Sequence, residues 1–530
     1  MGKDSRVYAQ IAVESRQRGR LDHDVLQSLI ELQKDMYQTL AGGFIQKICA
    51  SPCYILYWSE PGLRLYNERA DKDALFWDAT GSVVRRRDDG KQFLYYELAI
   101  RHPVKGKMGI PVTAMLSVDQ SLSIVLDWIC SFRQAEKRLF GHNKNKLVIP
   151  KMIISDQAMV FLLAALKEFN GESLETFLSR AWQICEGTAT VIDAKKTLVH
   201  FCASHFMNTA KRYMKKKDIA EQKLKIFMYM IGLLMNSQSI RDAHELLFDI
   251  YAVVGSNYIT QYNREFYDRI LRKINNFQTT AEFANSSWFM EESSPNDGGK
   301  PNPNLYTEED FQVIGSSTFK DWSNSILEKA AKFHSSNPPT ICDSTIINSL
   351  HSTTFAEYLK TRLMPIFPIW SGVLMGDLSR YNKDYLQGTV KPGSCNAYNS
   401  LENVATTNST IENRFRILKH VCLGGRTQHR LDEFSESLKS STVGVQKLVA
   451  LDCLKYPVFT RKPFSRKVRH SPYKRSLKSV KNCQKKNILV EEQWNKPRTQ
   501  SLNLLDKQGK YQKAPSSEIK LKETSLVNKI

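Results

Sequence analysis

The sequence predicts an α/β fold in which helices flank a mixed sheet and a long helical stretch interrupts it. Three observations support this prediction. Short runs rich in aromatic and β-branched residues occur at Ala74–Val84, Phe93–Arg101 and Gly109–Leu116. They are followed by an amphipathic segment, Ser121–Phe140, and then by an apolar run, Lys146–Ser155. Between residues 203 and 275, the apolar residues repeat with helical spacing.

The N-terminal part is predicted to be helical. Leu26, Leu29, Ile30 and Leu32 form an apolar stripe within residues 22–48, which Gly42-Gly43 would interrupt. We therefore treat residues 1–70 as an N-terminal helical region.

We expect the three β-rich runs to pair as consecutive antiparallel strands. Asp89-Gly90 is a strong turn signal between the first two, and Pro103 to Lys107 separates the second from the third. The apolar run that ends at Ser155 is typical of a strand buried on both faces. Further elements are expected after it: helices at Gln157–Phe169 and Leu174–Cys185, and a short strand at Thr190–Asp193 or Thr197–Phe201.

This order of strands and helices resembles the connectivity of an RNase H-like domain, whose first part would span residues 71–205. In that fold the first and fourth strands are neighbours, so Asp78 and Asp156 would lie close together. A register slip of one residue would turn either side chain to the other face of the sheet.

The next stretch is predicted to be a helical insertion at residues 206–400. Apolar stripes occur at Leu224–Met235, Ala243–Val254 and Tyr258–Ile274, while residues 290–305 have the composition of a loop or disordered segment. Helix is expected again at Thr354–Leu363 and Ile411–Val421. Glu412 follows Asp156 by 256 residues, so residues 401–425 would return to the core, before a helical region at 426–454.

The charge of the chain is concentrated at its C-terminal end. The net charge is +21, and residues 455–530 hold 20 Lys and Arg against 5 Asp and Glu, a net +15. A mobile basic tail of this kind favours contact with nucleic acid, a nuclear address, or both. The alternative is a solvated linker that has no partner. We expect this tail to be disordered.

The remaining composition favours a protein inside the cell that is not in a membrane. The first twenty residues are polar and charged, unlike a secretory signal. The longest apolar run, Ile226–Met235, is about half of a membrane span. The ten cysteines are scattered, which indicates reduced thiols and no disulfide framework.

Three acidic residues have the layout of a site for two divalent cations. Asp78 and Asp156 lie in or at the end of strand-like runs, where a carboxylate is costly without a cationic partner, and Glu412 opens a helix-like segment. Carboxylate oxygens are the ligands of Mg²⁺ and Mn²⁺, which can cut or transfer a phosphodiester. Each acid also has an ordinary alternative: a turn for Asp78, a helix N-cap for Asp156 and a solvated face for Glu412.

Two further groups of residues bear on function. Cys202 and His205 form a Cys-x-x-His motif, which is half of a zinc site or, alternatively, a structural cluster. Arg414, Arg416 and Lys419 follow Glu412 and are candidates to contact DNA phosphates, although an ordinary amphipathic helix has the same pattern.

Taken in order, these motifs resemble the catalytic region of DDE transposases of the Mutator-like and hAT-like group. The matching positions, over roughly residues 70–425, are Asp78, Asp156, Cys202-x-x-His205 and Asn408-x-x-x-Glu412-Asn413. The resemblance implies that Asp78, Asp156 and Glu412 hold Mg²⁺ or Mn²⁺. It also implies a nuclear, multimeric enzyme that hydrolyses a DNA strand and joins the freed 3′ hydroxyl to target DNA.

The chain departs from that group in its N-terminal part. Related transposases often have a zinc-finger domain before the core, whereas residues 1–70 contain Cys49 and Cys53 without zinc-finger spacing. Two other functions therefore stay open. One is a catalytically inactive, domesticated protein that binds DNA or chromatin. The other is an RNase H-like nuclease that does not transpose.

Overall fold

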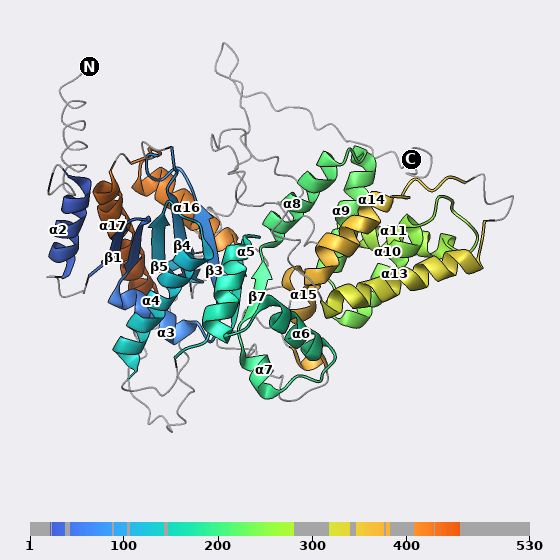
Figure 1. The fold of residues 1–530 in the computed structure, drawn as a ribbon, viewed down its shortest axis with the longest axis horizontal. Coiled ribbons are helices and arrows are strands. Elements are labelled where there is room, and N and C mark those ends of the chain that lie inside the picture. The colour runs from blue at the N-terminus through green and yellow to red at the C-terminus, as the bar shows by residue number, and fades with distance from the viewer. Residues whose placement is uncertain are drawn as a thin grey trace, which may run out of the picture. The chain divides into compact units, whose positions relative to one another are not determined.

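A computed structural model describes residues 22, 24–37, 43–86, 90–102, 107–141, 147–279, 317–339, 346–375, 378–381, 408–428 and 430–455. Within these ranges, helices cover both faces of one seven-stranded mixed sheet (Figure 1). The predicted α/β class is confirmed. The predicted loop at residues 290–305 and the basic tail beyond residue 455 lie outside the described residues.

The sheet contains both antiparallel and parallel pairs. Its strands are β1 (Ile45–Ala50), β2 (Cys53–Trp58), β3 (Ala74–Thr80), β4 (Leu94–Ile100), β5 (Ile110–Ser117), β6 (Met152–Ser155) and β7 (Leu198–Phe201). They are arranged in the order β1-β2-β5-β4-β3-β6-β7. Strands β3, β4 and β5 pair antiparallel, as predicted, whereas β6 runs parallel to both β3 and β7. The second of the two alternatives for the last strand is therefore confirmed.

The N-terminal region is not helical throughout, and the prediction of a helix over residues 22–48 is wrong in its last part. Helices α2 (Val25–Tyr37) and α3 (Glu60–Arg69) are present, but β1 and β2 form a hairpin between them. The sequence of β2, Cys-Tyr-Ile-Leu-Tyr-Trp, is rich in residues that favour strands. This strand is buried between β1 and β5, so it shows no polar alternation that would mark it as a strand.

Alternation along the central strands assigns side chains to the two faces of the sheet. Trp77 on β3 packs against Trp128 and Phe161, which lie on α4 (Leu122–Phe140) and α5 (Met159–Ala165). Tyr95 on β4 instead packs against Phe415 and Phe434. These last two belong to helices on the opposite face, α16 (Ser409–Ile417) and α17 (Leu431–Lys455) (Figure 1).

The described residues between β7 and α16 are mainly helical and add no strand to the sheet. Their helices are α8 (Ala203–Lys216), α9 (Glu221–Met235), α10 (Ile240–Val254), α11 (Arg264–Thr279), α13 (Thr318–Ser336), α14 (Thr353–Tyr358) and α15 (Phe367–Trp370). The predicted start of a helix at Tyr258 is wrong, because Tyr258 forms an isolated antiparallel bridge with Ile347. Before β7, α6 (Leu174–Cys185) and α7 (Val191–Lys195) complete the order. None of the helices in the described ranges has the length and hydropathy needed to cross a membrane.

Candidate metal centre

Asp78 lies on the central strand β3 and faces α16. It is paired directly with Glu97 of β4, and the side chain of Glu97 meets Arg414 of α16. Residues opposite each other in a strand pair share a face, so Asp78 lies on the α16 side of the sheet, away from the Trp77 ring. Asp78 is only 5% exposed, and its carboxylate accepts a hydrogen bond from the Ala79 backbone N–H at 2.7 Å.

Asp156 comes directly after β6 and stands level with Asp78. In the parallel pair of β3 and β6, Trp77 is paired with Ser155, so the next residue of each strand occupies the same level of the sheet. Asp156 is 6% exposed, and its Oδ1 accepts the N–H of Ala158 at 3.1 Å. It is not the N-cap of α5, because Ala158 occupies that position. The N-cap alternative is therefore wrong.

Burial and neighbouring charges shift the pKa values of these two acids. Burial raises the pKa of Asp78 to about 8, with a further contribution from the charge of Asp156. Burial also raises the pKa of Asp156, while the charge of His205 opposes that rise. Two buried carboxylates that repel each other are an arrangement that a bound cation would stabilise.

Cys202 and His205 lie at the start of α8, immediately after β7. The backbone N–H of Cys202 donates to the carbonyl of Ser155 at 2.6 Å, which connects the start of α8 to the strand that precedes Asp156. Burial opposes protonation of His205, but interactions with the side chain of Cys202 and with the charge of Asp78 outweigh it and raise the pKa of His205 to about 10. In the absence of a cation, a protonated His205 partly balances the acids.

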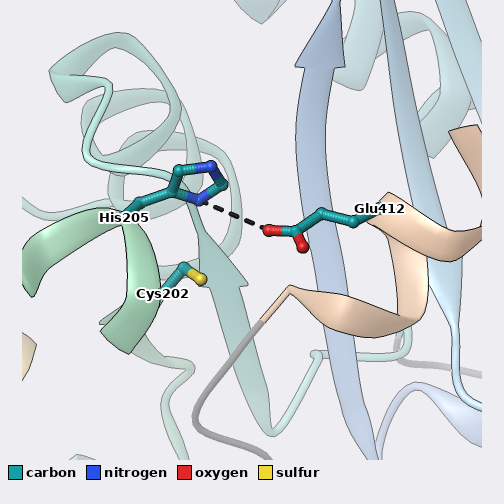
Figure 2. Close-up of side chains that lie close together, drawn as sticks. All are labelled: Cys202, His205 and Glu412. Atoms are coloured by element: carbon teal, nitrogen blue, oxygen red, sulfur yellow. Dashed lines mark ion pairs between the residues drawn. The ribbon is translucent and has the colours of Figure 1, made fainter. Parts of the chain in front are cut away.

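Glu412 reaches the same place from the first turn of α16. Its Oε1 lies 3.8 Å from Nδ1 of His205. Together with the Sγ of Cys202, ligand atoms of the three residues all lie within 4.8 Å of one another. Figure 2 shows Cys202 and His205 approaching from α8 and Glu412 from α16. The charge of Glu412 also contributes to the raised pKa of Asp78, so the structure brings the three predicted acids into one electrostatic cluster.

Asn408 connects the elements that carry these side chains. Its side-chain amide donates to the carbonyl of Trp77 on β3 at 3.2 Å, and its backbone N–H lies 3.2 Å from the Sγ of Cys202. Its own carbonyl accepts the N–H of Glu412 at 2.9 Å in the first turn of α16. Asn408 is fully buried, and these hydrogen bonds hold the N-cap residue of α16 against β3 and Cys202. The sequence indicated Asn408 only as a position in a motif.

The three basic residues predicted to contact DNA lie in different environments. Arg414 is fully buried, with its Nε 3.6 Å from Oε2 of Glu97 and its Nη1 donating to Ser441 at 2.7 Å. The guanidinium of Arg414 is therefore not available at the surface to contact a phosphate. Arg416 is exposed and Lys419 is partly exposed. Sequence reasoning missed Glu97 because an acid within an apolar strand gives no local indication of its partner.

The described residues therefore bring together Asp78, Asp156, Cys202, His205 and Glu412, which are far apart in the sequence. Hard oxygen ligands and softer nitrogen and sulfur ligands stand side by side in this cluster. No protein-family model matches the chain, and no curated protein matches it significantly.

Proposed function

We propose that this protein is a DDE-type DNA transposase, or a protein derived from one, that cleaves and joins DNA strands with divalent cations. The observation that carries the proposal is the parallel register of β3 and β6, which sets Asp78, on the strand that α16 packs against, level with Asp156. Glu412, on α16, adds a third carboxylate to the same cluster.

The sheet supports an RNase H-like core as part of this proposal. In the order β5-β4-β3-β6-β7, the first of the five strands along the chain is central, the next two pair antiparallel on one side and the last two run parallel on the other. The hairpin of β1 and β2 extends this sheet beside β5. The helices from α8 to α15 would then be an insertion between the last strand and the final catalytic helix.

The donor set fits hard divalent cations. Mg²⁺ and Mn²⁺ take carboxylate oxygens, and a pair held about 4 Å apart would activate the attacking oxygen and stabilise the leaving one. Asp78 and Asp156 supply buried carboxylates whose ionised forms are costly without a cation. Glu412, with its side chain 44% exposed, supplies a carboxylate at the solvent side of the cluster.

A DNA substrate is supported by basic residues close to the cluster in the sequence. Helix α8 begins at the cluster and carries Lys211, Arg212 and Lys215, of which the last two are exposed. Exposed cations of this kind can bind phosphates without reading the base sequence. The proposal includes action in the nucleus as a homo-oligomer, as is usual for the transposases that the motifs resemble.

One observation favours the catalytically inactive, DNA-binding alternative. The ion contact of Glu412 is with His205, at 3.8 Å, rather than with a position between the two aspartates. If His205 retained Glu412 in that position, the protein would keep its fold but would not cleave DNA. A cleavage assay on the chain and on a Glu412 variant distinguishes the active transposase from the inactive DNA-binding protein.

The test compares the chain with its Glu412→Gln variant on labelled DNA that carries the gene's own flanking sequences. We expect nicking in Mg²⁺ or Mn²⁺ that a chelator abolishes, and a loss of at least about a hundredfold in the variant. Removing even an outer partner of a metal ligand typically costs roughly 10–100-fold. Glu436→Gln is the matched control, since Glu436 on α17 makes a long contact of 3.9 Å with Lys439 of the same helix. Salt-sensitive DNA binding without cleavage in either protein would instead support the inactive alternative.

A further inference from the structure

Within the described part of the chain, Cys202, His205 and Glu412 form a second ligand set beside the two aspartates. One thiol sulfur, one imidazole nitrogen and one carboxylate oxygen lie within 4.8 Å of one another. Cys202 and His205 are three residues apart at the start of a helix, whereas Glu412 comes from another helix more than 200 residues later. Only the fold brings the third ligand to the motif.

The chemistry of this set differs from that of the carboxylate pair. Mg²⁺ and Mn²⁺ prefer oxygen, whereas sulfur, nitrogen and oxygen together are typical ligands of Zn²⁺. Bonds of about 2.0–2.3 Å to a tetrahedral Zn²⁺ place the ligand atoms roughly 3.3–3.6 Å apart. The observed 3.8 Å between His205 Nδ1 and Glu412 Oε1 is close to that spacing. Small rotations of the exposed Glu412 side chain would complete the approach.

One of the three ligand atoms, the Sγ of Cys202, is already held in place by hydrogen bonds. The Sγ of Cys202 accepts a hydrogen bond from the backbone N–H of Asn408 at 3.2 Å and lies 3.0 Å from the Oγ of Ser204. Such outer contacts orient metal ligands. Although the His205 side chain is 38% exposed, its Nδ1 is buried and makes no hydrogen bond of good geometry with the described residues. A buried nitrogen that makes no hydrogen bond is costly, and a metal bond would satisfy it.

We propose that Cys202, His205 and Glu412 bind one soft divalent cation of the Zn²⁺ class, with a fourth position open to solvent. Three protein ligands and one open position are the arrangement of reactive rather than purely structural zinc sites. Two ligands of the proposed zinc site, Cys202 and His205, lie outside the proposed DDE triad. The zinc site therefore does not depend on the proposed DNA cleavage. It shares Glu412 with that triad, and zinc would therefore draw Glu412 toward α8.

The test is titration of the reduced full-length chain with Co²⁺ alone, followed by displacement with Zn²⁺. We expect a thiolate-to-cobalt absorption band that saturates at one equivalent and is abolished by Zn²⁺. Cys202→Ser should remove the band, and His205→Gln and Glu412→Gln should each weaken binding at least about tenfold. Cys130→Ser is the matched control and should keep the band, because Cys130 donates to Glu168 away from this set.

Three results would overturn the proposal: no thiolate band in the unsubstituted chain, a band that persists in Cys202→Ser, or equal affinity in His205→Gln. Circular dichroism of each cation-free variant separates loss of a ligand from loss of the fold, and His205→Gln alters the more exposed side chain. Asp156→Asn should keep the cobalt band even where it removes Mg²⁺-dependent cleavage. Failure of the zinc site and failure of the DNA-cleaving site are thereby distinguished.

Discussion

Replacing Arg414 with methionine should lower the free energy of unfolding by about 3–5 kcal/mol, the usual cost of removing one partner of a buried ion pair. Arg414 and Glu97 are both fully buried, and their contact joins α16 to β4. Tyr95 donates to the same Oε2 of Glu97 at 2.5 Å, and Ser441 of α17 accepts from Arg414. Without Arg414, the Glu97 carboxylate would be buried with a single neutral donor.

The loss of unfolding free energy in Arg414→Met should depend on pH, because Glu97 ionises. Burial raises the pKa of Glu97 above its ordinary value of 4.5, although Arg414 and Tyr95 oppose the rise. A raised folded-state pKa means that the folded chain binds the proton more tightly, so stability falls as the pH rises above 4.5. Removing Arg414 raises that pKa further, so the variant should be more strongly destabilised at neutral pH than near pH 4.5.

Urea denaturation at the two pH values measures this effect. Arg416→Met is the matched control, because Arg416 is two residues away on the same helix and exposed. It should change the unfolding free energy by no more than about 0.5 kcal/mol. Equal urea midpoints for Arg414→Met and the unsubstituted chain would contradict the structural role of Arg414.

Replacing Asp156 with asparagine should lower the rate of metal-dependent cleavage at least about a hundredfold while leaving the fold intact. A direct ligand should matter at least as much as the outer partners of ligands, whose loss typically costs roughly 10–100-fold. Asparagine keeps an oxygen that can accept the N–H of Ala158, which Asp156 accepts at 3.1 Å. The local turn after β6 can therefore survive the substitution.

The same variant should be no less stable than the unsubstituted chain when cations are removed. Burial raises the pKa of Asp156 above 3.8, so ionisation of this carboxylate costs stability as the pH rises above that value. Asparagine carries no such charge. The comparison uses cleavage assays and thermal melts, with Asp127→Asn as the control, since Asp127 pairs with Lys47 on another part of the sheet. Cleavage retained by Asp156→Asn would exclude Asp156 from the mechanism.

Local sequence patterns predicted the centre of the sheet well. The runs that became β3, β4 and β5 are bounded by turn residues and rich in aromatic and β-branched side chains, and they form the antiparallel strands expected. The strand before Asp156 was also predicted, although the structure shortens it to Met152–Ser155. These elements were predictable because their own residues favour one backbone conformation.

Elements whose conformation depends on distant neighbours were not predicted. The residues of β2 favour a strand, but the sequence near Cys53 gives no indication that β5 is its partner in the sheet. The contact of Arg414 with Glu97 likewise forms across more than 300 residues. Glu412 was expected beside the aspartates, but its approach to Cys202 and His205 required the fold, since no spacing rule connects them.

We propose that Asp78, Asp156 and Glu412 together hold a pair of divalent cations against DNA. Anomalous X-ray scattering from crystals of the chain grown with a DNA duplex and MnCl₂ tests it most directly. We predict two manganese peaks about 4 Å apart, bounded by the three carboxylates. A crystal with bound DNA and no manganese between Asp78 and Asp156 would contradict the claim.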